Sequence, residues 1–423
     1  MLNRWKGVFS WALYDWANSA FATTVMAGFF PIFFKEYWTA PGRSHESTFY
    51  LGLANSTASL LVAVMAPFLG AVADRAAAKR KFLFTFAFLG IVMTGGLSLV
   101  SRGHWLQAVM LYTGASVGFA GANIFYDSLL PSVSSAARMD LSSSLGFGLG
   151  YMGGGLLFLL NVLMFQFPGF FGIPDRVLAV KLSFLSVALW WAVFSLPLLL
   201  FVHETRAAPR ETITEAVVRG WRQLVATLRD IRHLKVIGLF LLAYWFYIDG
   251  VDTIIRMAVD YGKSLGLDSG TLIVALLMVQ FTAFPAALLY GIFATRIGTK
   301  RAIMVAIWAY GVITLLAFFM QTKQHFFWLA AGIGLFQGGI QALSRSLFTQ
   351  IIPPAKSAQF FGFFNMLGKF ATILGPVLMG AVTLLLGSAR TGILSLVVLF
   401  AVGGILLSRV EIEEGKRMAK EFL

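Results

Sequence analysis

Acidic side chains recur near the start of two apolar stretches of this 423-residue chain. The first stretch reads WALYDWANSA, in which Asp15 and Asn18 lie three residues apart, and the second reads WFYIDGVD, in which Asp249 and Asp252 repeat that spacing. Residues three apart share one face of a helix. A carboxylate inside a membrane span is costly and usually faces a bundle interior or a water-filled cavity. The repeat therefore indicates two similar halves around an aqueous path, with Asp15, Asp249 and Asp252 as candidates for proton coupling.

Basic and amide side chains follow the acids at helical spacing within apolar stretches. Arg256 lies four residues after the second acid of WFYIDGVD, so the two can pair on one helix face. Gln341 and Arg345 belong to one stripe at intervals of four, and Asn365 and Lys369 belong to another. Arg and Lys can hold a carboxylate or phosphate, Arg with the better bidentate geometry. We expect substrate contacts from the side chains in these stripes or beside the acids: Tyr14, Asn18, Tyr247, Arg256, Gln341, Arg345, Asn365 and Lys369.

Two interpretations stay open for Asp127 and Arg345, which should lie in the cytoplasmic third of their spans. They can contact the substrate, or they can close an inner gate by ion pairing without touching it. For Asp252, Arg256 and Lys369, which should lie farther from that side, we favour substrate or proton binding over a structural role.

The elements that must position these side chains are membrane-spanning helices. The composition is 58% hydrophobic and 12% charged, whereas soluble proteins typically carry about 25% charged residues. The apolar stretches run to about 20 residues, the length that crosses a bilayer. We predict an all-α polytopic membrane protein with twelve spans, at residues 10–34, 50–73, 82–101, 105–130, 141–166, 177–201, 236–260, 269–295, 302–321, 326–350, 357–386 and 390–408.

The basic residues explain the net charge of +14 without a nucleic-acid partner. With both termini cytoplasmic, the inner loops hold about three times as many Lys and Arg as the outer ones, as the positive-inside rule requires. The compact length and short loops suit a bacterial inner membrane. We expect a monomer in the lipid bilayer, with a small-molecule substrate and protons as its partners.

The loop after the second predicted span reads GAVADRAAAKR and contains Gly70, Asp74, Arg75 and Arg80. A related loop, GIFATRIGTKR, follows the eighth span, with Thr295 where the acid would be. A parallel repeat of six spans is typical of the major facilitator architecture. We predict that the first loop belongs to the gate, because an acid at a helix end attracts cations and a helix N-terminus in only one state. The alternative is ordinary inner-loop charge.

The repeat divides the chain into a six-helix bundle at 1–201, a cytoplasmic linker at 202–235 and a second six-helix bundle at 236–423. Apolar residues at helical spacing predict an amphipathic helix on the membrane surface within the linker: Ile213, Val217, Leu224, Leu228 and Ile231.

WALYDWANSAFATTV, YWFYIDGVDTI and the GAVADR loop together resemble the vacuole-effluxer-like family of the major facilitator superfamily, over the whole chain. The resemblance implies two pseudo-symmetric bundles that rock against each other and export of amino acids or similar small solutes. It attaches to Tyr14, Asp15, Asn18, Ser19, Asp249 and Thr253.

Other function classes find less support in the sequence. The chain has no Cys and five scattered His, so we predict no metal site, cofactor or catalytic residue. The principal expectation is proton-coupled transport of a small polar solute. The alternatives are uptake or lipid-like substrate handling on the same fold, and a non-transporting membrane sensor or membrane enzyme.

Overall fold

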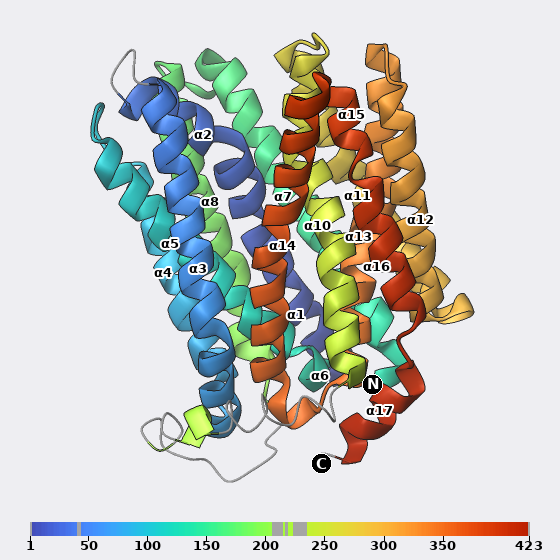
Figure 1. Cartoon of the computed structure of the whole chain (residues 1–423). Helices are drawn as coiled ribbons and strands as arrows, with labels where there is room; N and C mark the ends of the chain where they lie inside the picture. The colour runs from blue at the N-terminus through green and yellow to red at the C-terminus, as the bar shows by residue number, and fades with distance from the viewer. Residues whose placement is uncertain (1, 40–43, 205–214, 216–218, 223–234, 422–423) are drawn as a thin grey trace.

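The computed structural model describes residues 2–39, 44–204, 215, 219–222 and 235–421, and all regular elements within them are helices. Figure 1 shows the helices standing side by side, with both chain termini at one end of the molecule, which we call the terminal end. The elements of the first half are α1 (Leu2–Ala20), η1 (Phe21–Phe29), α2 (Phe30–Phe33), η2 (Phe34–Trp38), α3 (Ser44–Ala76), α4 (Lys79–Leu97), α5 (Trp105–Ser128), α6 (Leu130–Val133), η3 (Ala136–Arg138), α7 (Met139–Gln166), η4 (Pro168–Phe171) and α8 (Arg176–Phe201). Those of the second half are α10 (Lys235–Ser264), α11 (Ser269–Ile297), α12 (Thr299–Phe318), α13 (Lys323–Ile351), η6 (Pro354–Lys356), α14 (Ser357–Leu386), α15 (Ala389–Leu394), α16 (Val397–Ser408) and α17 (Ile412–Glu421).

The helices agree with the twelve predicted spans, with shifted ends. Within the described residues, 11 helical segments are long and apolar enough to cross a membrane. The remaining span is α14, whose 30 residues include the apolar stretch Leu374–Leu386. Two features differ from the prediction: the first span turns π-helical at Phe21–Phe29, and α15 and α16 share the last span. A mostly apolar stretch hides such changes of helical pitch, because the hydrophobic pattern does not mark a single face.

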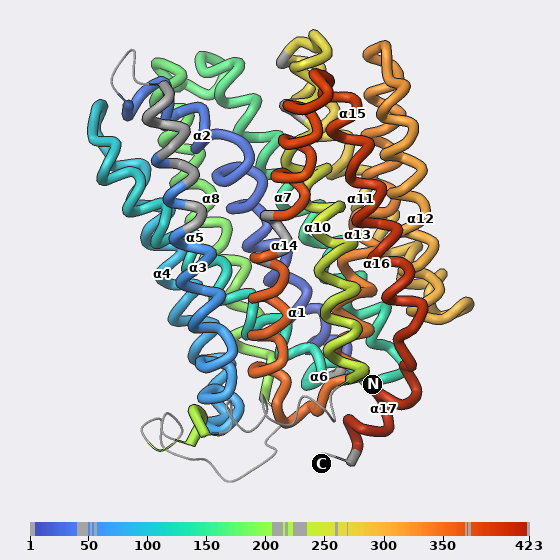
Figure 2. The backbone as a smooth tube through the Cα atoms, in the orientation of Figure 1, coloured from blue at the N-terminus to red at the C-terminus, as the bar shows by residue number. Residues whose placement is uncertain are grey.

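Glycines let the two halves approach closely at the terminal end, where α3 contacts α14 and α7 contacts α11 (Figure 2). A Cβ on Gly70 would overlap the backbone of Ala358, and one on Gly291 would lie 2.6 Å from the Ser144 hydroxyl. The two related loops of the sequence therefore occupy related places, each leaving a glycine against the first helical turns of the other half.

Glycines of α7, which is the fifth predicted span, allow the close helix approach that small residues permit in lipid. A Cβ on Gly150 would lie 2.7 Å from the Ser19 hydroxyl, so α7 and α1 approach at van der Waals distance. The predicted amphipathic helix of the linker lies outside the described residues, apart from 215 and 219–222.

Candidate functional site

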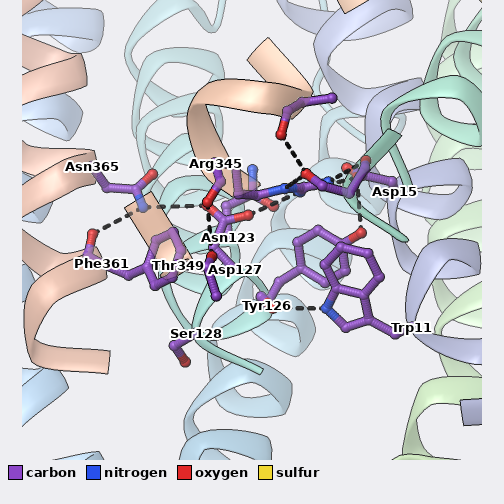
Figure 3. Close-up of polar contacts among 12 residues, drawn as sticks. Trp11, Asp15, Asn123, Tyr126, Asp127, Ser128, Arg345, Thr349, Phe361 and Asn365 are labelled. Carbon is purple, nitrogen blue, oxygen red and sulfur yellow. Dashed lines mark hydrogen bonds and ion pairs between the residues drawn. The ribbon is translucent and has the colours of Figure 1, made fainter. Parts of the chain in front are cut away.

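The guanidinium of Arg345 joins the two halves of the molecule (Figure 3). Its Nη1 lies 3.0 Å from the Asp127 carboxylate of α5 and 3.3 Å from the Asp15 carboxylate of α1. Only 3% of the Arg345 side chain is exposed, against 13% for Asp15 and 11% for Asp127. The structure thus unites three charges that lie far apart in the sequence.

Ser143 of α7 satisfies the rest of the guanidinium. Arg345 donates from Nε to the Ser143 hydroxyl at 2.9 Å and from Nη2 to its carbonyl at 2.9 Å. The same hydroxyl donates to the Ala342 carbonyl at 2.7 Å, one turn earlier on α13. Every guanidinium nitrogen therefore has a partner in the first half, so both hydrogen bonds and ion pairs hold the orientation of the Arg345 side chain.

Three aromatic rings surround the same guanidinium. Its central carbon lies 4.2 Å from the ring centroid of Phe147, 4.8 Å from that of Trp11 and 5.3 Å from that of Tyr126. The Tyr126 hydroxyl donates to Asp15 at 2.8 Å, and the Trp11 indole donates to the Tyr126 carbonyl at 2.9 Å. We call Trp11, Asp15, Tyr126, Asp127 and Phe147 the guanidinium cage; all five come from the first half.

The charges of this cluster do not balance. Asp15 and Asp127, if both are ionised, carry one more negative charge than Arg345 neutralises. An uncompensated charge is expensive in a buried, low-dielectric site. A single proton on either carboxyl would restore neutrality, so the cluster has the chemistry of a proton site as well as of a gate.

The GAVADR loop makes a second connection between the halves. The Asp74 carboxylate accepts from the Ala358 and Gln359 backbone N–H groups at 3.1 and 2.9 Å, at the N-terminus of α14. Lys79 lies 2.9 Å from that carboxylate and donates to the Ser357 hydroxyl at 2.7 Å. This arrangement combines a helix cap with a favourable helix dipole.

The other predicted loop residues lie differently. Arg80 donates from its guanidinium to the Leu199 carbonyl of α8, and its backbone N–H donates to Glu204 at 2.7 Å. The first contact stays within the first half and the second goes to the start of the linker, so these contacts do not bring Arg80 to the junction. Arg75 is half-buried at the end of α3.

The second loop connects to the first half through an acid that the sequence reasoning missed. Asp140, in the first turn of α7, accepts from the Thr299 hydroxyl at 2.8 Å, the Ser346 hydroxyl at 2.5 Å and the Gln350 amide at 3.3 Å. Thr295 donates to the carbonyl of Ile292 on its own helix. The missing acid of the second loop is therefore replaced from the opposite half.

Comparison with known proteins identifies the family. Residues 3–420 match the family described as vacuole effluxer Atg22 like. The chain belongs to this family. It is 38% identical to the uncharacterized MFS-type transporter YxiO of Bacillus subtilis, over 97% of this chain and 96% of that protein. It is 25% identical to autophagy-related protein 22 of Coccidioides immitis, over 98% of this chain and 88% of that one.

Solved structures show the fold of this vacuole effluxer-like protein. The human organic anion transporter MFSD10 (TETRAN) superposes with a TM-score of 0.73 at 15% identity, over 96% of this chain and 99% of that one. The proton:xylose symporter XylE gives a TM-score of 0.68 at 12% identity, over 99% and 98%. The predicted all-α major facilitator fold of two six-helix bundles is confirmed.

Several predicted site residues of the effluxer-like protein lie inside a bundle. Asp249 is fully buried and accepts from the Gly375 backbone N–H at 2.9 Å and the Thr253 hydroxyl at 3.3 Å, between α10 and α14. The Tyr247 hydroxyl lies 2.7 Å from that of Ser344 on α13. The structure therefore does not bring Asp249 to Asp15, although their sequence settings match.

Tyr14 and Asn18 are also buried, within the first bundle. Tyr14 packs against Tyr126 with ring centroids 5.1 Å apart, and the Asn18 amide donates to Asn123 of α5 at 2.5 Å. In this state both serve the packing of α1 on α5.

The remaining predicted contacts lie nearer the junction. Tyr151 of α7 donates to Gln341 of α13 at 2.5 Å, and the Asn365 amide lies 3.4 Å from Asp127. Asp252 is half-buried and Arg256 is exposed. The Lys369 side chain lies outside the described residues.

Proposed function

We propose that this protein is a proton-coupled secondary transporter that moves a small polar solute, an amino acid or similar, by rocking its halves. In this proposal 1–201 and 236–423 move as units and 202–235 links them. Family membership and a major facilitator fold support transport in general. The observation that carries the mechanism is the cluster of Arg345 with Asp15 and Asp127, because it joins the halves through buried charges.

Opening the terminal end requires Arg345 to leave Asp15 and Asp127. Removing one partner from a buried ion pair costs about 3–5 kcal/mol when nothing replaces it. The barrier falls if a proton neutralises one carboxylate, or if water and a charged solute replace the lost contacts. The ion pairs thus oppose opening of the empty, unprotonated carrier, and protonation or solute binding weakens that opposition, which links the gate to coupling.

Asp74 and Asp140 add contacts that exist only while the terminal end is closed. Each crosses between the halves and holds hydrogen-bond donors of the other half. Helix caps contribute about 1 kcal/mol each. In the proposed cycle these contacts break together, so that the gate opens in a concerted step.

We base the proposed solute class and direction on the family. The name of the family describes effluxers, and we therefore favour export, from a bacterial inner membrane with both termini cytoplasmic and the protein acting as a monomer. Arg345, once released, would hold a solute carboxylate, with Gln341 and Asn365 near it. We assign Asp252 to proton exchange along the path, and Arg256 and Lys369 to its outer part.

Flux in liposomes tests this proposal. The purified chain is reconstituted with a pH-sensitive dye inside, and a panel of amino acids and small peptides is added under an imposed proton gradient. We expect solute-dependent proton movement with at least one member, reduced in a variant with both Asp15→Asn and Asp127→Asn. Solute movement without proton movement would reject coupling, and no movement across the panel would reject transport of these solutes.

A further inference from the structure

The guanidinium cage surrounds an organic cation, which in this structure is the Arg345 side chain of the opposite half. Two carboxylates lie on one side of the Arg345 guanidinium, at 3.0 and 3.3 Å. Ring centroids of Trp11, Tyr126 and Phe147 lie within 5.3 Å of its central carbon. Aromatic faces and carboxylates together are the groups that recognise ammonium and guanidinium ligands.

The cage belongs to one bundle, whereas its occupant belongs to the other. α1, α5 and α7 supply the five cage residues, and α13 supplies Arg345. Hydrogen bonds within the first half orient the cage independently of Arg345, since Trp11 donates to the Tyr126 backbone and Tyr126 donates to Asp15. Separation of the halves would therefore remove the occupant and leave the site formed.

The position of Gly146 on α7 is explained by its closeness to the guanidinium cage. A Cβ on Gly146 would lie 2.9 Å from Arg345 Nη2, from the Asp15 carboxylate and from the Tyr126 hydroxyl. Only glycine leaves room for a planar cation between α7 and α1. The space thus fits a guanidinium or an ammonium group in contact with both carboxylates.

We infer that the cage binds the cationic group of the transported solute in the state open at the terminal end, where the solute replaces Arg345. This inference rests on the proposed function and adds the substrate class: solutes with an ammonium or guanidinium group. A zwitterionic amino acid would then lie between the separated charges, with its ammonium in the cage and its carboxylate on Arg345. The cation can come from the α-amino group or from a basic side chain.

Chemical rescue of Arg345→Ala tests the cage directly. Ethylguanidinium at millimolar concentration should raise the unfolding temperature of the purified full-length variant in a saturable way, because it refills the cage. N-ethylurea, which has a similar shape and no charge, should not. Adding Phe147→Leu should weaken the apparent affinity by about 3- to 30-fold, the range of one desolvated cation–π contact. Equal responses to both compounds, or an unchanged affinity in the double variant, would overturn the inference.

A second experiment keeps the inference testable if Arg345→Ala does not fold: amino acids and their analogues are tested as inhibitors of transport in liposomes that contain the wild-type protein. Leucine is compared with N-acetylleucine, and arginine with citrulline, so that each pair differs in one cationic group. If the uncharged analogue inhibits more than about 10-fold more weakly in the first pair, the α-amino group is the cation that the cage binds. The same result in the second pair identifies the side-chain guanidinium. Equal inhibition within both pairs would reject the cage as a cation site while leaving transport intact. An absence of all transport would reject the proposed function, whereas the rescue experiment would still report on the cage.

Discussion

Replacing Arg345 with Met should destabilise the protein mainly through the two acids that it leaves behind. Asp15 would keep the Tyr126 hydroxyl at 2.8 Å, and among the described residues Asp127 would keep the long contact of 3.4 Å from Asn365. Loss of one partner from a buried ion pair costs about 3–5 kcal/mol. We expect a loss of that size at neutral pH, because Met fills the volume and still packs against the aromatic rings.

A variant that also lacks the two acids separates the effect of uncompensated charge on stability from the effect of lost packing. In the triple variant Asp15→Asn, Asp127→Asn, Arg345→Met, no charge of the cluster remains. Replacement of a buried ionic cluster by uncharged residues is often neutral or stabilising. The triple variant should therefore recover most of the stability that Arg345→Met loses, which is a strongly non-additive result.

The stabilities are compared by thermal unfolding of the detergent-purified variants, heated at one pH and one scan rate. Lys323→Met provides the matched control, because Lys323 pairs with Asp268 at 2.6 Å on the exposed surface. That exposed pair should contribute little to stability. If Arg345→Met and the triple variant lose the same stability, uncompensated charge is not the cause, and the charge argument for the gate fails.

Two further predictions concern the closed junction, and a third concerns proton exchange. Gly70→Ala should disfavour closure because its Cβ meets the Ala358 backbone, whereas Gly380→Ala, with open space around its Cβ, should be neutral or slightly stabilising. Since the chain has no Cys, labelling of a single Cys introduced at Ser346 reports opening. Equal labelling of the two variants would refute the packing argument. Asp140→Ala should increase the same labelling by about 5- to 30-fold, because in the Ser346→Cys background the Thr299 hydroxyl and the Gln350 amide lose their acceptor, at about 1–2 kcal/mol in total; unchanged labelling would remove Asp140 from the gate. Asp252→Asn should remove the pH dependence of solute binding measured by calorimetry, and an unchanged profile would exclude it from coupling.

The sequence predicts the spans well because long apolar segments and basic loops are strong, local signals. It also places Asp127 and Arg345 at similar depth, which is why an ion-paired gate was one of two interpretations. It does not choose between them, since the choice depends on which helix faces turn toward each other. The structure shows the pair and adds Ser143, a residue whose small polar side chain gives no signal in an apolar stretch.

Asp140 illustrates a signal that was present and overlooked. An acid in the first turn of a helix is common, because it complements the helix dipole, so Asp140 alone suggests nothing. The second loop, however, lacks the acid of the first loop, and Thr295 stands in its place. When one copy of a repeat lacks an acid, the surface that this copy contacts is the place to look for a replacement. Here α7 supplies it as Asp140.

Asp15 and Asp249 show how matched sequence settings can lead to different partners. Asp15 meets an Arg of the other half, whereas Asp249 binds a backbone N–H beside Pro376, within its own bundle. A proline in a helix disrupts the hydrogen bonds around it, and the Asp249 carboxylate accepts from the backbone N–H next to that proline. In the proposed cycle the two acids would act at different places: Asp15 would respond to separation of the halves, and Asp249 to bending of α14 at Pro376. A transporter that couples these events would bend α14 as Arg345 leaves the cage, since Asn365 of the same helix contacts Asp127.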